Sequence, residues 1–356
     1  MKKRIARLRD KMRELSLDAY LVTSYENYRY FSGFCGSNCT LIIGGDTCFA
    51  LTDGRYDIQI KEQTDGFETV IISRPMHEHI AEILSENFFL RVGYETHKMT
   101  DFELRNLKAA SGDTEYVPCD DFGEEIRSIK DKGEIDAIRR AVRCSDDAFA
   151  AFVKTVSRGM TEREAAARLE YEMALRGSRA AAFDTIAASG IRSAMPHAEP
   201  SASPIEDNCL MTFDFGATVN GYMSDITRTV HIGTPSKQLC ELWELVFDVQ
   251  QKCIAHIQCG MRASELDEYQ CSLFADHGME KYIMHSLGHG VGLAIHEAPT
   301  VSRRSHATLS ENMIITVEPG LYIKDVGGCR IEDTVLITKN GGVALTQSPH
   351  RINITL

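Results

Sequence analysis

The sequence predicts two domains, an α/β domain at the N-terminus followed by an α+β domain. The chain has 356 residues, and a single hydrophobic core rarely grows beyond about 250–300 residues. In the first third, short apolar runs separated by Gly and Asp alternate with helical patterns, whereas the later part is mainly strand-like runs broken by Gly and Pro. A charged stretch separates these patterns, so we expect domains at residues 1–122 and 123–356.

The N-terminal domain is expected to begin with a helix at Arg4–Leu15, because its apolar residues recur at helical spacing. The predicted strands that follow are Ala19–Val22, Thr40–Ile43, Cys48–Leu51, Thr69–Ile72 and Arg91–Gly93. The further predicted helices are His79–Glu86 and Asp101–Ala110. This alternation is typical of a sheet covered by helices.

The second domain is expected to begin with helices and to continue mainly as strands. Its Lys- and Glu-rich opening reads as a linker into a long amphipathic helix, in which Ile135, Ile138 and Val142 lie on one face. The further predicted helices are Glu162–Arg176, Gln238–His256 and Ala263–Ala275. TERE at 161–164 is a helix-start signal.

Charge and cysteine content narrow the classes of function. There are 39 Lys plus Arg against 51 Asp plus Glu, a net charge of -12, which argues against nucleic acid or an anionic membrane as a partner. No apolar run reaches the ~18 residues of a membrane span. The 11 cysteines are odd in number and scattered without C-x-x-C spacing, which indicates free thiols and a cytoplasmic protein.

The segment 210–232 predicts a β-hairpin that brings two carboxylates together. The Asn-Gly pair at 220–221 is the strongest short signal for a two-residue turn. With that turn, Asp214 faces Thr227. Asp225 then lies on the same face of the hairpin as the diagonal neighbour of Asp214, and the backbones of the two Asp residues are roughly 7–8 Å apart. Such a pair can share two cations held ~3.5–4 Å apart. Apolar neighbours indicate burial, and two solvated Asp side chains are the alternative.

Residues 284–299 place His285, His289 and His296 in a glycine-rich segment. The spacing of four between the first two resembles a helical zinc motif, but three interleaved glycines argue against a helix. They favour an extended segment whose backbone closely approaches a metal or a substrate. A lone His is more often a core residue than a ligand, whereas three in this setting favour a site.

Glu318 and Glu332 add two carboxylates. Glu318 ends a β-like run before Pro-Gly, and Glu332 lies in an apolar strand pattern at 329–338, on the same face as Arg330. An ion pair with Arg330 or another basic residue is the alternative to a ligand role for Glu332. Four carboxylates with at least one imidazole and no thiolate suit Mn²⁺, Co²⁺ or Mg²⁺ better than a structural Zn²⁺. The residues therefore predict metal-assisted hydrolysis.

The chain resembles the pita-bread metallopeptidases of the Xaa-Pro dipeptidase and aminopeptidase P family. The C-terminal motifs that carry the resemblance are DFG (214–216), SDITRT (224–229), GHGVGLAIHE (288–297), VEPG (317–320) and RIED (330–333). The N-terminal motifs YENYRYFSGFCGSN (25–38) and LTDGRYDIQ (51–59) resemble a creatinase-type N-terminal domain. The resemblance implies that domain followed by a pita-bread catalytic domain.

The resemblance also implies two divalent metal ions, with Mn²⁺ expected and Co²⁺ or Zn²⁺ as alternatives. Asp225 and Glu332 would bridge the ions. Asp214 would complete one coordination site, and His289 with Glu318 would complete the other. Glu318 would in addition carry a proton from the bridging water to the leaving amine.

Further roles follow from the same resemblance. His197 would help to bind substrate and stabilise the tetrahedral intermediate, and His296 would contact the substrate amide. Arg330 and Tyr322 would lie behind the ligands or in the substrate pocket, and His285 would support the site from behind. The expected partners are short proline-containing peptides and a second copy of the chain in a homodimer.

The leading hypothesis is a dipeptidase that cleaves the bond before proline. Aminopeptidase P, which acts on longer peptides, is the close alternative, because the sequence does not show whether the cleft is closed beyond the proline. Creatinase and non-enzymatic members of the fold lack metal ligands, whereas all five are present here. Methionine aminopeptidase shares the core but does not need the N-terminal domain.

Overall fold

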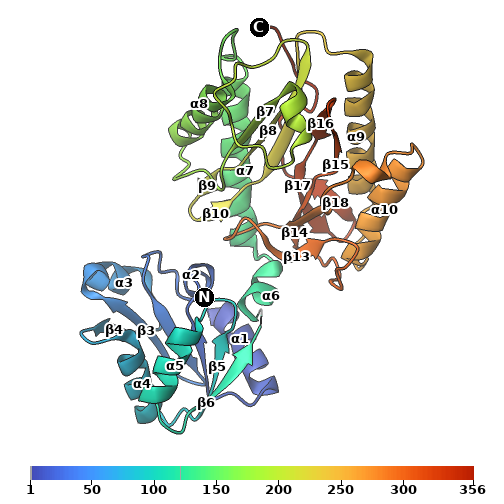
Figure 1. The fold of residues 1–356 in the computed structure, drawn as a ribbon. Coiled ribbons are helices and arrows are strands. Elements are labelled where there is room, and N and C mark those ends of the chain that lie inside the picture. The colour runs from blue at the N-terminus through green and yellow to red at the C-terminus, as the bar shows by residue number, and fades with distance from the viewer. Residues whose placement is uncertain (1, 121) are drawn as a thin grey trace. The chain divides into compact units, whose positions relative to one another are not determined.

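The computed structural model describes residues 2–120 and 122–356. The chain forms two compact units, one ending at Arg127 and the other spanning Ser128–Leu356 (Figure 1). The predicted boundary at residue 122 adjoins Asp121, which lies outside the described residues. The first unit is α/β and the second is α+β, as predicted. Among the described residues, no helix combines the length and apolar composition needed to cross a bilayer.

The N-terminal unit is built on one mixed sheet of six strands in the order β4-β3-β2-β1-β5-β6. The strands are β1 (Ala19–Val22), β2 (Thr40–Gly44), β3 (Cys48–Asp53), β4 (Glu68–Ile72), β5 (Arg91–Glu95) and β6 (Glu115–Cys119). The helices are α1 (Lys2–Glu14), α2 (Tyr25–Ser32), α3 (Asp57–Gln63), α4 (Met76–Glu86) and α5 (Asp101–Ala110). β1 is buried along its whole length and pairs antiparallel with β2 and parallel with β5.

The predicted N-terminal strands and helices are all present, but helices α2 and α3 and strand β6 were not predicted. The sequence carries clear signals for α2. The Ser24 side chain accepts a hydrogen bond from the Asn27 N–H at its start, and Gly33 ends it with a φ of 86°. Aromatic residues over 25–31 obscured these caps because they are typical of strands.

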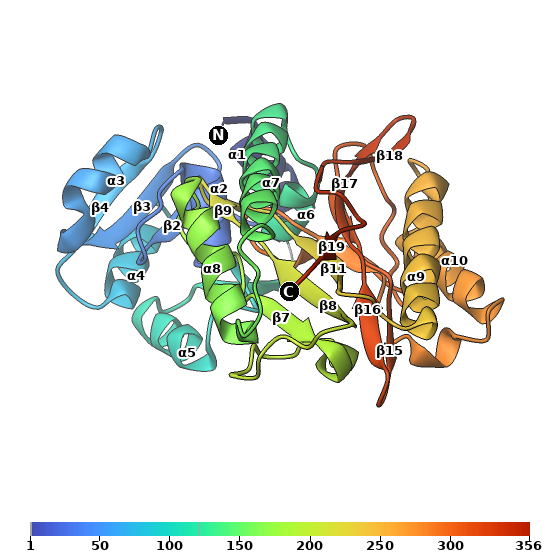
Figure 2. The ribbon, with the colours of Figure 1, turned by 90° about the horizontal axis from the view of Figure 1, so that it is seen from above.

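The C-terminal unit consists of two helix pairs, each packed on its own sheet. Helices α7 (Lys132–Phe152) and α8 (Glu162–Leu175) share an apolar core with the sheet β19-β11-β8-β7. Helices α9 (Lys237–His256) and α10 (Ala263–Ala275) share another with the sheet β13-β12-β14-β17-β18. Figure 2 shows the two helix pairs with the strands of this unit between them. The predicted linker contains helix α6 (Phe122–Ser128), and α7 follows it.

The strands of this unit bring segments distant in the sequence together. The first sheet contains β7 (Ile186–Ser189), β8 (Cys209–Phe215), β11 (Ile226–Ile232) and β19 (Asn353–Ile354). The second contains β12 (Gly288–Gly290), β13 (Glu297–Val301), β14 (Ile314–Val317), β17 (Asp333–Thr338) and β18 (Gly341–Ala344). Two small ribbons pair β9 (Thr218–Val219) with β10 (Tyr222–Met223) and β15 (Gly320–Ile323) with β16 (Gly327–Arg330).

The predicted hairpin is confirmed in its turn and in its register. Asn220 and Gly221 have φ values of 50° and 78°, as a turn with two positive-φ residues requires. β8 pairs antiparallel with β11, and Asp214 lies opposite Thr227. The flanking apolar residues are buried against α7, where the Phe149 and Phe215 rings lie 4.9 Å apart. The alternative of an exposed hairpin is therefore wrong.

The single strand predicted at 329–338 is wrong. The chain forms β16 up to Arg330 and β17 from Asp333, and these strands belong to different sheets. Glu332 lies at the change of sheet, where its N–H donates to the Thr227 carbonyl (3.2 Å). Arg330 forms its ion pair with Asp214 instead of with Glu332. Among the described residues, Glu332 forms an ion pair neither with Arg330 nor with another basic residue, so this alternative to a ligand role is wrong.

A buried ion pair next to this point joins the two sheets. Arg228 is 0% exposed and Asp333 1% exposed, and Arg228 Nη2 lies 2.8 Å from Asp333 Oδ1. Gln250 of α9 and His350 also hydrogen-bond Asp333, at 2.7 and 2.9 Å. Burial alone would raise the pKa of Asp333, but Arg228 and His350 hold it well below its usual value.

We expect Asp333→Ala to destabilise the C-terminal unit strongly. The substitution leaves the Arg228 guanidinium buried without its counter-ion, which typically costs about 3–5 kcal/mol. Thermal and urea unfolding can be followed by the fluorescence of Trp243, the single tryptophan, which lies in this unit. Glu311→Gln is the control because its pair with Lys339 is exposed and 4.0 Å long, so its loss should stay under about 1 kcal/mol. Equal losses in the two variants would contradict the role of the buried pair.

Candidate metal centre

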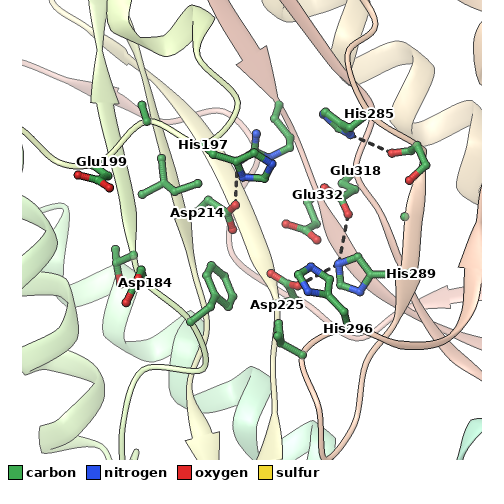
Figure 3. Close-up of a pocket in the computed structure, with 18 of the residues that line it drawn as sticks. Asp184, His197, Glu199, Asp214, Asp225, His285, His289, His296, Glu318 and Glu332 are labelled. Carbon is green, nitrogen blue, oxygen red and sulfur yellow. Dashed lines mark hydrogen bonds and ion pairs between the residues drawn. The ribbon is translucent and has the colours of Figure 1, made fainter. Parts of the chain in front are cut away.

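A cavity with a volume of ≈ 610 Å³ lies in the C-terminal unit (Figure 3). All five predicted ligands line it, namely Asp214, Asp225, His289, Glu318 and Glu332. His197, His285, His296 and Arg330 line it as well, whereas the predicted Tyr322 lies behind the wall and reaches the cavity only through its hydrogen bonds.

The five predicted metal ligands lie on, or directly next to, five different strands of the two sheets. Asp214 lies on β8 and Asp225 immediately before β11, so the predicted hairpin supplies both. His289 lies on the short strand β12, so the glycine-rich segment is extended at this histidine, as predicted, and bends between residues 292 and 296. Glu318 follows β14, and Glu332 precedes β17. The cavity therefore lies where strand ends of the two sheets meet, and the ligands on those strand ends line it.

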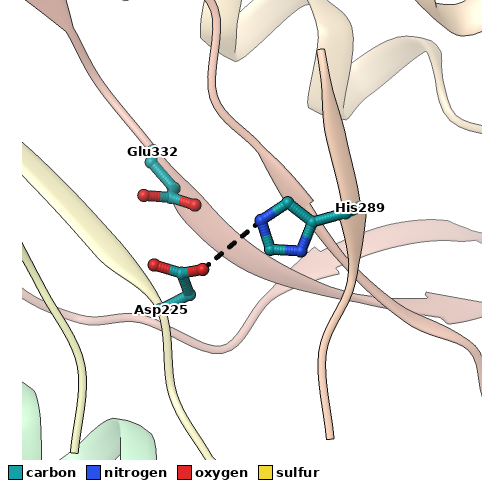
Figure 4. A group of neighbouring side chains, drawn as sticks. All are labelled: Asp225, His289 and Glu332. Atoms are coloured by element: carbon teal, nitrogen blue, oxygen red, sulfur yellow. Dashed lines mark ion pairs between the residues drawn. The ribbon is translucent and has the colours of Figure 1, made fainter. Parts of the chain in front are cut away.

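The tightest part of the cluster is formed by Asp225, His289 and Glu332 (Figure 4). One ligand atom from each lies within 4.8 Å of the other two. His289 Nε2 lies 3.5 Å from an Asp225 oxygen and 3.4 Å from a Glu318 oxygen. Carboxylate oxygens and an imidazole nitrogen at this spacing can bind a common divalent cation.

The hydrogen bonds of His289 determine its tautomer. Its Nδ1 lies 3.0 Å from the Gly290 carbonyl oxygen, which can only accept, so Nδ1 carries the hydrogen. Burial lowers the pKa of His289 and favours the neutral ring. Nε2 therefore presents a lone pair toward the carboxylate oxygens, an arrangement that is unfavourable unless a cation lies between them.

Two buried carboxylate oxygens in the cavity have no hydrogen-bond partner. Glu332 Oε2 accepts a hydrogen bond from Thr227 Oγ1 (2.7 Å), while Glu332 Oε1 has none. Asp214 Oδ2 accepts one from Arg330 (2.6 Å), while Asp214 Oδ1 has none. Buried acceptors are rarely left unpaired. These open oxygens fit metal ligands, so the residues present suit the divalent ions that the sequence predicts.

The shifted pKa values of the clustered carboxylates also indicate that the cavity suits divalent cations. Burial raises the pKa of Asp225 well above its ordinary value, and Glu332 and Asp214 raise it further. Burial, followed by the neighbouring Glu318, raises the pKa of Glu332 well above its ordinary value. Burial also raises the pKa of Glu318. Like charges held this closely disfavour the ionised state. Bound cations would restore it, because metal ligands must be deprotonated.

Arg330 is held by a chain of hydrogen bonds behind the ligands. Nη1 of Arg330 donates to the Tyr322 hydroxyl at 2.6 Å. The Nδ1 of His285 donates to the Ser286 carbonyl (2.8 Å), so its Nε2 accepts from the Tyr322 hydroxyl (2.7 Å). Burial lowers the pKa of His285, which keeps this arrangement neutral. The chain aims Arg330 at Asp214 and leaves one Asp214 oxygen facing the cavity.

Two threonines in the site were not predicted. Thr227 Oγ1 donates to Glu332 and accepts from Arg330 Nε (3.2 Å). Thr316 Oγ1 accepts from the His289 N–H and donates to Glu318 Oε1, both at 3.0 Å. Thr227 is two residues after Asp225, and Thr316 is two residues before Glu318. Because side chains two apart in a strand share a face, this spacing is a usable signal for such residues.

The two remaining histidines lie on the cavity wall. The His296 ring centre is 4.3 Å from that of His289, and burial followed by the neighbouring His289 lowers the pKa of His296. His197 is exposed and lines the cavity from the loop before β8. Their roles toward a substrate stay predictions.

Comparison with known proteins agrees with this architecture. Residues 136–339 match metallopeptidase family M24, and residues 4–129 match the creatinase/prolidase N-terminal domain. The chain is 37% identical over 355 residues to an Xaa-Pro dipeptidase of Pyrococcus furiosus, covering 99% of this chain and 100% of that protein.

Two solved structures show the same fold. The Xaa-Pro dipeptidase of Bacillus anthracis has a TM-score of 0.96 and 35% identity, covering 100% of this chain and 99% of that one. The X-Pro aminopeptidase of Thermotoga maritima MSB8 has a TM-score of 0.90 and 35% identity, covering 97% and 100%.

We expect Asp225→Asn to stabilise the metal-free protein at pH 7. A carboxylate with a raised pKa contributes stability below its ordinary pKa near ~3.9 and loses it as the pH rises through the raised value. Removing that charge should therefore add roughly 1–3 kcal/mol to the metal-free protein. Metal should raise the melting temperature of the wild type by binding the native state, but not that of the variant.

Melting curves with EDTA or Mn²⁺, together with elemental analysis, measure both effects. Asp248→Asn is a matched control, because Asp248 lies on the outer surface of α9 and pairs with Lys252. It should leave metal content and the metal-dependent rise unchanged. A variant Asp225→Asn that still holds its metal would show that the ligand assignment is wrong.

Proposed function

Because the chain belongs to metallopeptidase family M24, we propose that it is an Xaa-Pro dipeptidase, which hydrolyses the bond before proline in short peptides. The observation that carries the proposal is the buried group of Asp225, His289 and Glu332 with its open carboxylate oxygens. Similarity over the full chain to Xaa-Pro dipeptidases supports the class of substrate.

We propose that two divalent ions bind between the two sheets. Asp225 and Glu332 would bridge them, Asp214 would complete one site, and His289 and Glu318 the other. Bound divalent cations supply Lewis acidity toward a peptide carbonyl and lower the pKa of a water molecule. Mn²⁺ is the metal we propose, because four carboxylates and one imidazole form a mostly hard donor set.

Glu318 is the proposed carrier of the proton from the attacking water to the proline nitrogen that leaves. A carboxylate within reach of the attacking water can accept its proton as general base and then release it as general acid. Thr316 donates a hydrogen bond to Oε1 of Glu318, so that oxygen is already engaged. The proton would therefore be taken up and released at Oε2.

His197 and His296 are the proposed donors to the substrate. Burial lowers the pKa of His296, so its ring is neutral near pH 7 and carries one N–H donor. An N–H aimed at the carbonyl oxygen stabilises the negative charge that develops there in the transition state. His197 would act in the same way from the opposite wall of the cavity (Figure 3).

An Xaa-Pro aminopeptidase is the second candidate. The solved X-Pro aminopeptidase of Thermotoga maritima has the same 35% identity to this chain as the dipeptidase of Bacillus anthracis. The two functions share the metal centre and differ in whether residues beyond the proline are accepted.

Two further properties belong to the proposal. We expect a homodimer, for which light scattering of the purified protein is the check. We also expect a reducing compartment such as the cytoplasm, which is supported by the 11 cysteines, all present as free thiols.

We expect His296→Ala to lower activity while the metals stay bound. The side chain is absent from the proposed ligand set, and loss of one donor to a developing oxyanion typically lowers kcat by about 10²–10³-fold. Parallel elemental analysis and Xaa-Pro dipeptide kinetics would measure both quantities. Loss of metal with loss of activity would instead make His296 part of the metal centre.

Peptide length tests the proposed function itself. With Mn²⁺, Co²⁺ or Zn²⁺ added to metal-free protein, Ala-Pro should be cleaved with a kcat/KM roughly tenfold or more above that for Ala-Pro-Ala. Mn²⁺ should give the highest activity of the three. Efficient cleavage of the tripeptide would favour the aminopeptidase. A protein that binds no metal and cleaves neither peptide would refute both functions.

A further inference from the structure

One wall of the cavity carries two acidic side chains that the metal centre does not use. Asp184 lies just before β7, and Glu199 lies in the loop before β8, two residues after His197. Both are exposed, and among the described residues neither carboxylate has an ion pair or a hydrogen-bond partner. Figure 3 places both on the Asp214 side of the cavity, away from His289.

Thr185 adds a third polar group to the same wall. It lines the cavity next to Asp184 and is only 4% exposed. Its Oγ1 is buried and has no hydrogen-bond partner. Because buried hydroxyls are normally paired, this one is suited to a group that enters the cavity.

The negative charge of this wall is not offset by nearby basic side chains. Among the described residues that line the cavity, Arg330 is the sole Lys or Arg, and it is paired with Asp214. Arg192 contacts the Glu199 backbone carbonyl, but its charge is paired with Glu162 at 2.8 Å. Asp184 and Glu199 therefore present net negative charge to whatever enters.

We propose that Asp184, Glu199 and Thr185 form a subsite for a Lys or Arg side chain at the residue before proline. The proposal rests on the proposed function. A Lys ammonium has three hydrogen donors and no acceptor, and this wall offers two carboxylates and one hydroxyl. Phe183 and Ile186 line the cavity beside them and would cover the apolar stem of a long basic side chain.

The position before proline follows from the chemistry of the substrate. The α-nitrogen is separated from the scissile carbonyl carbon by one atom, so it must lie at the metal ligands themselves. The carboxylate of a C-terminal proline would be repelled by an acidic wall. A long cationic side chain on the first residue is the substrate group that can reach Asp184 and Glu199 while the carbonyl stays at the metals.

The test compares Lys-Pro with norleucine-Pro, which has a similar stem without the ammonium. We expect wild-type kcat/KM to favour Lys-Pro by about fivefold, the size of a partly exposed ion pair. The preference should lie in KM, because the charge binds ground state and transition state alike. It should shrink as ionic strength rises. In the double variant Asp184→Asn with Glu199→Gln, the ratio should fall to about one.

The double variant Asp248→Asn with Glu170→Gln is the charge-matched control, since both residues are exposed, on α9 and α8, and lie outside the cavity lining. It should keep both activities and the wild-type ratio. A double variant that keeps the Lys-Pro preference would overturn the subsite. Equal loss for both substrates would also overturn it, because the acids would then serve the shared α-ammonium or the cavity shape.

Binding without turnover separates this inference from the proposed function. Calorimetric titration of the metal-free protein with the two dipeptides should show tighter binding of Lys-Pro, and the double variant should remove that difference. Cleavage of norleucine-Pro with no charge preference in either assay would overturn the subsite alone. Absence of cleavage of every Xaa-Pro peptide by the metal-loaded wild type would overturn the proposed function.

Discussion

The repulsion among four carboxylates held together in a buried cavity is the constraint on which the rest of the C-terminal unit depends. Asp225 and Glu332 are almost completely buried, and burial raises the pKa of both. Glu332 raises the pKa of Asp225 further, and Glu318 raises that of Glu332 further. Water cannot solvate these charges adequately, so positive charge must enter the cluster. Divalent cations satisfy that need and at the same time supply the reactivity of a hydrolase.

The surrounding framework holds the cluster in a shape that cations can use. Arg330 takes one oxygen of Asp214 and Thr227 takes one of Glu332, which leaves the other oxygen of each facing the cavity. Tyr322 and His285 fix Arg330 from behind. Because Asp214 and Glu332 are each oriented by a second residue, their geometry does not depend on flexible side chains alone.

Charge also organises the rest of the cavity. The Arg228–Asp333 pair holds the two sheets together next to Glu332 and is almost fully buried. The wall of Asp184 and Glu199 faces the cavity without such compensation. One set of charges is therefore satisfied inside the fold, a second requires cations, and a third faces the space that a substrate would enter.

The sequence by itself determined the ligand types and the hairpin, because an Asn-Gly turn and the two-residue period of a strand settle register locally. That is why Asp214 could be placed opposite Thr227. The break of the strand at Glu332, the pairing of Arg330 with Asp214, and the unpaired Thr185 hydroxyl were decided by the tertiary structure. The break depends on which sheet each strand joins, the Arg330–Asp214 pair joins residues more than 100 positions apart, and the state of the Thr185 hydroxyl depends on the shape of the cavity. No local sequence pattern encodes such packing.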